Sequence, residues 1–172
     1  LRTQVVGTLP QVKSWRTQLG TVALLGAAPN DAGASQVKGV SQYEDAIRTL
    51  RNSILLGEMA RECKTLLFTS AAPSEGKSTT AVHLAIAHAQ QHHKTLLVDC
   101  DLRRPTIHKR FGVSNAAGLS DVLLDGRPWE SVLMRTQSVP NLAVMPAGSV
   151  SRKSTDIVGQ VLPAILEEAS RE

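Results

Sequence analysis

Aromatic side chains are scarce in this sequence: two Trp, one Tyr and two Phe make up 3% of its 172 residues. A core must therefore be built from aliphatic side chains, which suits buried parallel strands covered by helices. No apolar run approaches the roughly 20 residues needed to cross a bilayer. The first residues also lack the charged-then-apolar pattern of a signal peptide. Because the chain begins with Leu rather than Met, we expect it to be a piece of a longer protein.

Cysteine is also rare. Cys63 and Cys100 lie far apart and form no Cys-x-x-Cys pair, which argues against a zinc site or a redox motif. The formal net charge of +4 is a mild excess that suits phosphate ligands, an anionic membrane surface or nucleic acid. Because no dense Lys/Arg tract with interleaved aromatics is present, nucleic acid is not expected as a partner.

Hydrophobic periodicity predicts the elements of an α/β fold. Ser41 and Glu44 fit a capping box at the start of the first helix. Helices are predicted over 41–57, 81–91, 118–125, 128–134 and 154–170, and buried strands over 64–70, 94–99 and 141–146. Residues 5–10 are interpreted as a short strand or an extended entry segment. Residues 13–39 are predicted to be mostly loop, with 21–25 as a candidate strand, and 108–110 is expected to be a solvated basic loop. The succession of strand, glycine-bearing loop, helix and strand from 64 to 99 predicts a βαβ unit and a mostly parallel sheet with flanking helices.

A phosphate-binding loop is indicated directly after the strand predicted at 64–70, in the run Ser70-Ala71-Ala72-Pro73-Ser74-Glu75-Gly76-Lys77-Ser78-Thr79-Thr80. Such a P-loop needs small residues that turn backbone N–H groups toward phosphates, a Lys for the β and γ phosphates, and a Ser or Thr for Mg²⁺. Gly76, Lys77 and Ser78 fill these positions, and the next helix adds its positive N-terminal end. Ala71 stands where the usual pattern has Gly, so the motif is a variant.

Two carboxylates follow the next predicted strand. Asp99 and Asp101 lie at its carboxyl end, where open α/β sheets bind ligands. One of them can hold Mg²⁺ through water or orient an attacking hydroxyl, because Mg²⁺ prefers a few carboxylates together with phosphates and water. Arg103 and Arg104 come next and can neutralise phosphate or pair with the carboxylates.

The two motifs together resemble those of the bacterial tyrosine kinases of capsule and exopolysaccharide synthesis (BY-kinases). Residues 70–80 look like the Walker A motif of that family, and 96–105 look like its Walker A′ motif. The family also carries a Glu-x-x-Arg-x-x-Arg oligomerisation helix ahead of the P-loop. Asp45, Arg48 and Arg51 match it, with Asp in place of Glu. Residues 5–10, 118–123 and 146–149 also resemble stretches of that family, but these matches are less specific.

The resemblance implies an ATP-dependent protein tyrosine autokinase that regulates exopolysaccharide or capsule polymerisation and export at the cytoplasmic face of the plasma membrane. ATP and Mg²⁺ would be its cofactors. Residues 1–40 would be a segment and loop after an upstream membrane span, and 41–172 a partial P-loop kinase domain, itself soluble. The partners would be further subunits in a ring, the tyrosine cluster of a neighbouring subunit, and the polysaccharide machinery.

The resemblance also implies roles for individual residues. Lys77 would neutralise the β and γ phosphates, Asp99 would be the base or orienter for an attacking tyrosine hydroxyl, and Asp101 would assist the metal. The catalytic residues expected are Lys77, Asp99 and Asp101; those for the nucleotide are Ser74, Glu75, Gly76, Lys77, Ser78, Thr79 and Arg103; those for the metal are Ser78, Asp99 and Asp101.

Two departures from the family pattern stand out. The Walker B strand should follow the last helix, but the chain stops at Glu172, and Tyr43 is its single tyrosine, without a C-terminal tyrosine cluster. We therefore expect the parent protein to supply both parts. One alternative is an ATPase of the ParA or MinD type, although the signature Lys of that class is Ala72 here. The other is a non-catalytic nucleotide-binding module that regulates export.

Overall fold

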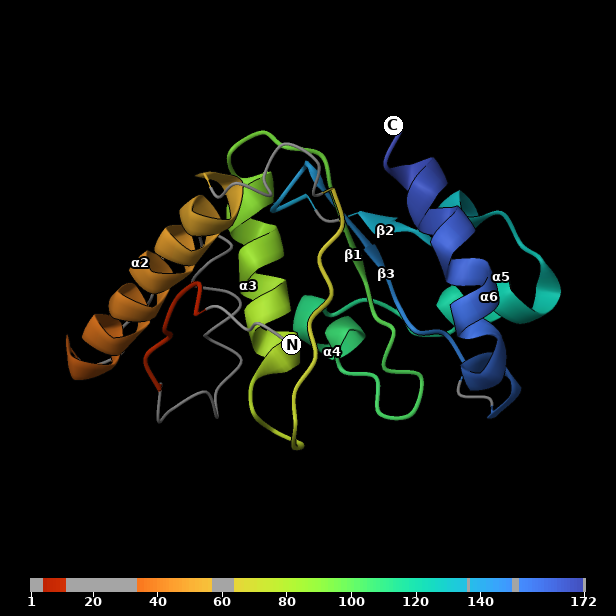
Figure 1. The fold of residues 1–172 in the computed structure, drawn as a ribbon, viewed down its shortest axis with the longest axis horizontal. Coiled ribbons are helices and arrows are strands. Elements are labelled where there is room, and N and C mark those ends of the chain that lie inside the picture. Colours follow the sequence, from red (N-terminus) through yellow and green to blue (C-terminus); the bar gives the residue numbers. More distant parts are fainter. Residues whose placement is uncertain (1–4, 12–33, 57–63, 136, 150–151, 172) are drawn as a thin grey trace.

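A computed structural model describes residues 5–11, 34–56, 64–135, 137–149 and 152–171. The helices are α2 (Ala34–Leu56), α3 (Lys77–Ala89), α4 (Ile107–Phe111), α5 (Leu119–Asp125), α6 (Arg152–Ala169) and the 3₁₀ helix η1 (Trp129–Val132). The strands are β1 (Thr95–Val98), β2 (Met134–Arg135) and β3 (Leu142–Met145). Figure 1 shows α2 and α3 on one side of the strands and α5 and α6 on the other.

The three described strands form one small sheet in the order β1-β3-β2. β1 pairs with β3 in parallel, with Leu97 opposite Val144. β2 pairs with β3 in the antiparallel direction, with Met134 opposite Val144. The α/β fold with a mostly parallel sheet and flanking helices is thus confirmed.

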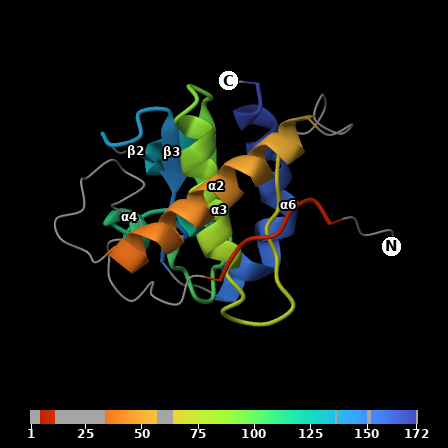
Figure 2. The ribbon, with the colours of Figure 1, turned by 90° about the vertical axis from the view of Figure 1, so that its left-hand side faces the viewer.

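Each face of the sheet has its own helices because strand side chains alternate between faces. Leu97 of β1 joins the core beneath α3, whereas its neighbours Leu96 and Val98 pack on the core formed with α5 and α6. A third apolar cluster, built around Tyr43 and Ile47, joins α2 to the outer side of α3. Figure 2 shows α2 crossing obliquely over α3. The P-loop helix is therefore held between the sheet and α2.

The strand predicted at 64–70 is wrong. This segment has no regular secondary structure, most of it is exposed, and the side chain of Leu67 is 87% exposed. An apolar run becomes a strand only when a neighbour accepts its backbone hydrogen bonds, and none of the described strands pairs with it. The βαβ unit predicted from 64 to 99 therefore lacks its first strand, and the parallel pair of the described sheet is β1 with β3.

Other differences concern where elements begin. α2 begins at Ala34, so residues 34–39 are helical where a loop was predicted. Ser41 therefore lies inside the helix and does not cap it, although the helix ends at Leu56 as expected. α3 begins at Lys77, ahead of the predicted start at 81. The region 128–134 forms η1 and then enters β2, a two-residue strand too short for a periodic signal. Of the two interpretations of 5–10, the strand is absent from residues 5–11, and the candidate strand at 21–25 lies outside the described residues.

The basic loop predicted at 108–110 is instead the helix α4. Ile107 is buried in the core beneath α3, and Phe111 packs against that core. Apolar side chains four apart put one face of a single helical turn against the sheet. The turn ends at Gly112, whose φ of 63° is the left-handed conformation that commonly ends helices. A five-residue helix offers too little periodicity to stand out from a loop.

A buried histidine makes stability depend on pH. His83 of α3 is fully buried with its ring edge-on to Tyr43, and burial, with a contribution from the Arg110 charge, lowers its pKa to about 4. Between about pH 6.5 and pH 4, His83 binds a proton in the unfolded chain but not in the folded chain. The free energy of unfolding therefore decreases as the pH falls through this window. The complete loss is roughly 3 kcal/mol.

We expect urea unfolding to show this loss between pH 7 and pH 4. In the His83→Leu variant the free energy of unfolding should depend less steeply on pH, by the amount that corresponds to about one bound proton. Parallel curves for the two proteins would contradict the assignment to His83.

Candidate nucleotide-binding site

The P-loop has the backbone shape that its sequence requires. Gly76 lies just before α3 with a φ of 96°, a value that side-chain-bearing residues rarely adopt. Ser74 also has a positive φ of 65°. No side chain caps the N-terminus of α3, and its first turn holds no acidic residue. The backbone N–H groups at this end, which have no partner within the helix, are thus left for a ligand.

Glu75 closes the loop on itself. Its Oε2 accepts hydrogen bonds from the backbone N–H groups of Ala71 at 3.0 Å and Ala72 at 3.1 Å. The hydroxyl of Ser70 donates to the carbonyl of Ala72 at 3.0 Å. The carboxylate of Glu75 therefore binds the loop's own backbone, and its predicted contact with nucleotide stays a prediction.

Lys77 and Asp101 meet at the N-terminus of α3. Lys77 Nζ donates to Asp101 Oδ2 at 2.7 Å, and both side chains are about a third exposed. Asp101 Oδ1 also accepts from the backbone N–H of Arg104 at 3.0 Å. Desolvation opposes ionisation of Asp101, but the Lys77 ammonium and the backbone N–H groups outweigh it and lower its pKa. The pair brings the two predicted motifs into direct contact.

Asp99 has a different environment. It is buried, its Oδ1 accepts from the backbone N–H of Asp101 at 3.1 Å, and its Oδ2 accepts from those of Thr106 at 3.1 Å and Ile107 at 3.0 Å. These bonds tie the segment after β1 to the start of α4. Such contacts suit a residue that orients the loop carrying Asp101.

The other predicted residues lie around this centre. Ser78 and Thr79 are half-buried in the first turn of α3, whereas Ser74 is exposed on the loop. Arg103 is exposed on the segment between Asp101 and α4. Lys77, Ser78, Thr79 and Asp101 are thus gathered at one end of α3. Mg²⁺ binds through one or two carboxylates together with phosphates and water, and a hydroxyl at Ser78 with a carboxylate at Asp101 fits that donor set.

Two residues of this region were missed by sequence reasoning. Arg110 of α4 donates from Nη2 to Thr79 Oγ1 at 2.8 Å. The side chain of Tyr43, on α2, is hydrogen-bonded to that of Thr80. The spacing of Ile107 and Phe111, with Arg110 between them, was the one available sign that 108–110 is a helical turn with a half-buried arginine.

The residues predicted for oligomerisation lie on α2. Arg48 and Asp45 form an exposed pair with 3.4 Å between Nη1 and Oδ1. An exposed pair of this kind contributes at most about 1 kcal/mol. Arg51 is half-buried. Desolvation is the main cause that lowers the pKa of His88 on α3, and the charges of His93 and Arg51 lower it further. Asp45 and Arg48 are therefore accessible to another subunit, whereas Arg51 is turned partly toward α3.

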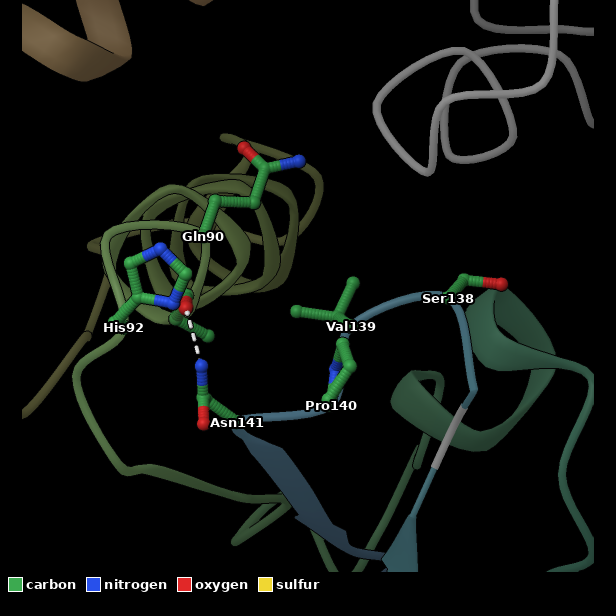
Figure 3. A pocket seen from close by; sticks show the side chains of 7 residues that line it. Gln90, His92, Ser138, Val139, Pro140 and Asn141 are labelled. Carbon is green, nitrogen blue, oxygen red and sulfur yellow. Dashed lines mark hydrogen bonds between the residues drawn. The ribbon is translucent and has the colours of Figure 1, made fainter.

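A cavity lies at the other end of α3. Figure 3 shows the turn after α3, including Gln90 and His92, facing the segment from Ser138 to Asn141. The cavity measures ≈ 460 Å³, and Asn141 Nδ2 bridges it by donating to the Ala89 carbonyl at 3.3 Å. It contains none of the predicted site residues.

Comparison with known proteins identifies the family of this chain. Residues 66–148 match the CobQ/CobB/MinD/ParA nucleotide binding domain family. The chain is 39% identical over 118 residues to the tyrosine-protein kinase YwqD of Bacillus subtilis, covering 69% of this chain and 49% of that protein. It is 32% identical over 137 residues to the tyrosine-protein kinase Wzc of Salmonella typhimurium, covering 71% of this chain and 19% of that protein.

A solved structure of a bacterial tyrosine kinase also resembles this chain. The kinase domain of Escherichia coli tyrosine kinase ETK superposes with a TM-score of 0.78 at 28% identity, covering 98% of this chain and 65% of that domain. The chain therefore carries a P-loop nucleotide-binding domain. Within that class, the sequence-based identification is confirmed: the chain is a relative of the bacterial tyrosine kinases. It spans about half the length of the Bacillus relative.

Proposed function

We propose that this chain forms the ATP-binding part of a bacterial protein tyrosine autokinase that uses Mg²⁺. The observation that carries the proposal is the contact between Lys77 and Asp101, 2.7 Å apart at the uncapped N-terminus of α3. This arrangement places a cation for phosphate and a carboxylate for a metal at the same helix end. The relatives named as tyrosine kinases support phosphoryl transfer to tyrosine.

The residues have separate tasks in this proposal. Lys77 leaves Asp101 to neutralise the β and γ phosphates, and the backbone N–H groups of the first turn hold the phosphate oxygens. Ser78 and Asp101 hold Mg²⁺, which supplies charge neutralisation when bound. Asp99 fixes the loop that carries Asp101 and orients the tyrosine hydroxyl. Phosphoryl transfer depends mainly on such positioning and charge neutralisation.

The wider context is proposed from the same relatives. Ring assembly through Asp45, Arg48 and Arg51 would bring the tyrosine cluster of one subunit to the nucleotide of the next. The site would then serve polysaccharide polymerisation and export at the cytoplasmic face of the membrane, with residues 1–40 linking it to a membrane span and 41–172 forming part of the kinase domain. No helix among the described residues is long and apolar enough to span a bilayer.

The test is to follow the γ phosphate of labelled ATP in the full-length protein with Mg²⁺. We expect the label on protein tyrosine, and its loss when EDTA removes the metal. Steady release of free phosphate without phosphotyrosine would replace the proposal with an ATPase of the ParA or MinD type, whose family the sequence also matches. If the protein forms neither phosphotyrosine nor free phosphate, the kinase assignment is overturned and a regulatory module is the remaining explanation.

A further inference from the structure

Two consecutive threonines of the P-loop helix are each bound by a different helix. Thr79 Oγ1 accepts a hydrogen bond from Arg110 on α4 at 2.8 Å, and Thr80 is hydrogen-bonded to Tyr43 on α2. Figure 1 shows α3 lying between α2 and α4. The first turn of α3 is the turn that presents backbone N–H groups to phosphate. Its two hydroxyls are therefore attached to the rest of the fold from both sides.

The environment of Arg110 is costly for a guanidinium. The side chain is half-buried, and desolvation is the main cause that lowers its pKa. No carboxylate of the described residues lies within ion-pair distance of it. A desolvated cation normally requires an anion nearby. The group bonded to Nη2 here is the neutral hydroxyl of Thr79, one residue after the predicted Mg²⁺ ligand Ser78.

Tyr43 is fixed equally well on the other side. Tyr43 is only 5% exposed, and its ring meets the ring of His83 edge-on with 5.2 Å between the ring centroids. Ile47, Leu84 and Ala87 complete the cluster that joins α2 to α3. Burial raises the pKa of Tyr43, so its hydroxyl stays protonated. The rigid ring thus places one hydroxyl from α2 on the first turn of the P-loop helix.

We infer that Arg110 and Tyr43 are positioning residues for the nucleotide: they hold Thr79 and Thr80 so that the first turn of α3 keeps its N–H groups aimed at the phosphates. The inference rests on the proposed nucleotide binding at this loop. It also links α2 to the site, because α2 carries both Tyr43 and the exposed pair of Asp45 and Arg48. A shift of α2 on assembly would thereby change the position of the first turn of α3, which holds the phosphates.

The experiment compares single and double variants of the full-length protein, using a fluorescent ATP analogue with Mg²⁺ for affinity and ATP for the KM. We expect Arg110→Met to raise the KM for ATP about 10-fold with kcat changed less than twofold, because Arg110 acts through Thr79 on the N–H groups that bind the phosphates and not on the reacting groups. Arg110→Lys should recover part of the affinity. Lys109→Met, an exposed cation on the same helix, is the matched control and should bind as the wild type does.

Double-mutant cycles identify the contacts themselves. Tyr43→Phe removes only the hydroxyl and should weaken binding about threefold, with no further loss when Thr80→Val is added. Arg110→Met and Thr79→Val should be non-additive in the same way. Additive losses, or unchanged affinity in Arg110→Met and Tyr43→Phe, would overturn the inference. If Arg110→Met does not fold, the Tyr43 cycle and Arg110→Lys decide alone.

The same measurement separates this inference from the proposed function. A wild-type protein that binds no nucleotide would remove the proposed function. A wild type that binds nucleotide, with additive cycles, would remove only the roles of Arg110 and Tyr43. If the role of Arg110 were purely structural, Arg110→Met would lower the melting temperature of the nucleotide-free protein and reduce kcat. Arg110→Lys would then not restore the KM for ATP.

Discussion

Full-length protein carrying Lys77→Met is expected to lose about 100-fold or more of its phosphotyrosine signal, because removing one preorganised charge from a phosphoryl-transfer site typically has such an effect. Lys77 is the P-loop cation and already stands 2.7 Å from Asp101 at the N-terminus of α3. Methionine keeps the length of the side chain and removes the charge. The measurement is an anti-phosphotyrosine blot after incubation with ATP and Mg²⁺.

The matched control is Arg135→Met, which removes an exposed cation from the edge strand β2. It should leave the signal unchanged. The Lys77 variant should fold, because its ion pair is partly exposed and such pairs contribute about 1 kcal/mol or less. Equal melting temperatures for the two variants would show this. A folded Lys77→Met protein with an undiminished signal would place the chemistry elsewhere.

The largest loss of stability is expected from Gly118→Ala. Gly118 precedes α5, and a Cβ added to it would lie 2.2 Å from the carbonyl oxygen of Pro146 and 2.4 Å from the backbone nitrogen of Gly148. Both atoms belong to the backbone, so neither can move without displacing the segment that follows β3. We expect the free energy of unfolding to fall by about 3 kcal/mol or more, as in severe overpacking, and urea unfolding measures it.

A glycine on α6 provides the control with the opposite sign. Gly159 has nothing within 4 Å of an added Cβ. Gly159→Ala should therefore raise the free energy of unfolding by roughly 0.5–1 kcal/mol, because alanine loses less conformational freedom in a helix. Similar losses from both substitutions would show that backbone crowding at Gly118 is not the cause.

The sequence predicted the site best where chemistry and local structure lie in the same short segment. Gly76, Lys77 and Ser78 lie at a turn and at the start of α3, so their predicted role in phosphate binding depends on one stretch of chain. Asp101 was predicted to belong to the same site because it follows the carboxyl end of a strand, where open α/β sheets bind ligands. The structure brings Lys77 and Asp101 together, although the segment before the P-loop is not a strand.

The errors have a common physical origin: they depend on partners distant in the sequence. Residues 64–70 have the composition of a strand but no described neighbour to pair with. Arg110 was assigned to a solvated loop because nothing local shows that α4 packs beneath α3. Tyr43 was noted only as the single tyrosine on the predicted helix 41–57, and its ring fills the contact between α2 and α3. Periodicity cannot report which distant group a side chain will meet.

The bonds from Glu75 to the N–H groups of Ala71 and Ala72 have a thermodynamic consequence. A loop cross-linked by its own carboxylate has already lost much of its conformational freedom before a ligand arrives. Binding then has less chain to order, since ordering one backbone residue costs roughly 1–2 kcal/mol, and pre-organisation favours affinity. Calorimetry should therefore find a smaller entropic penalty for nucleotide binding in the wild type than in Glu75→Ala.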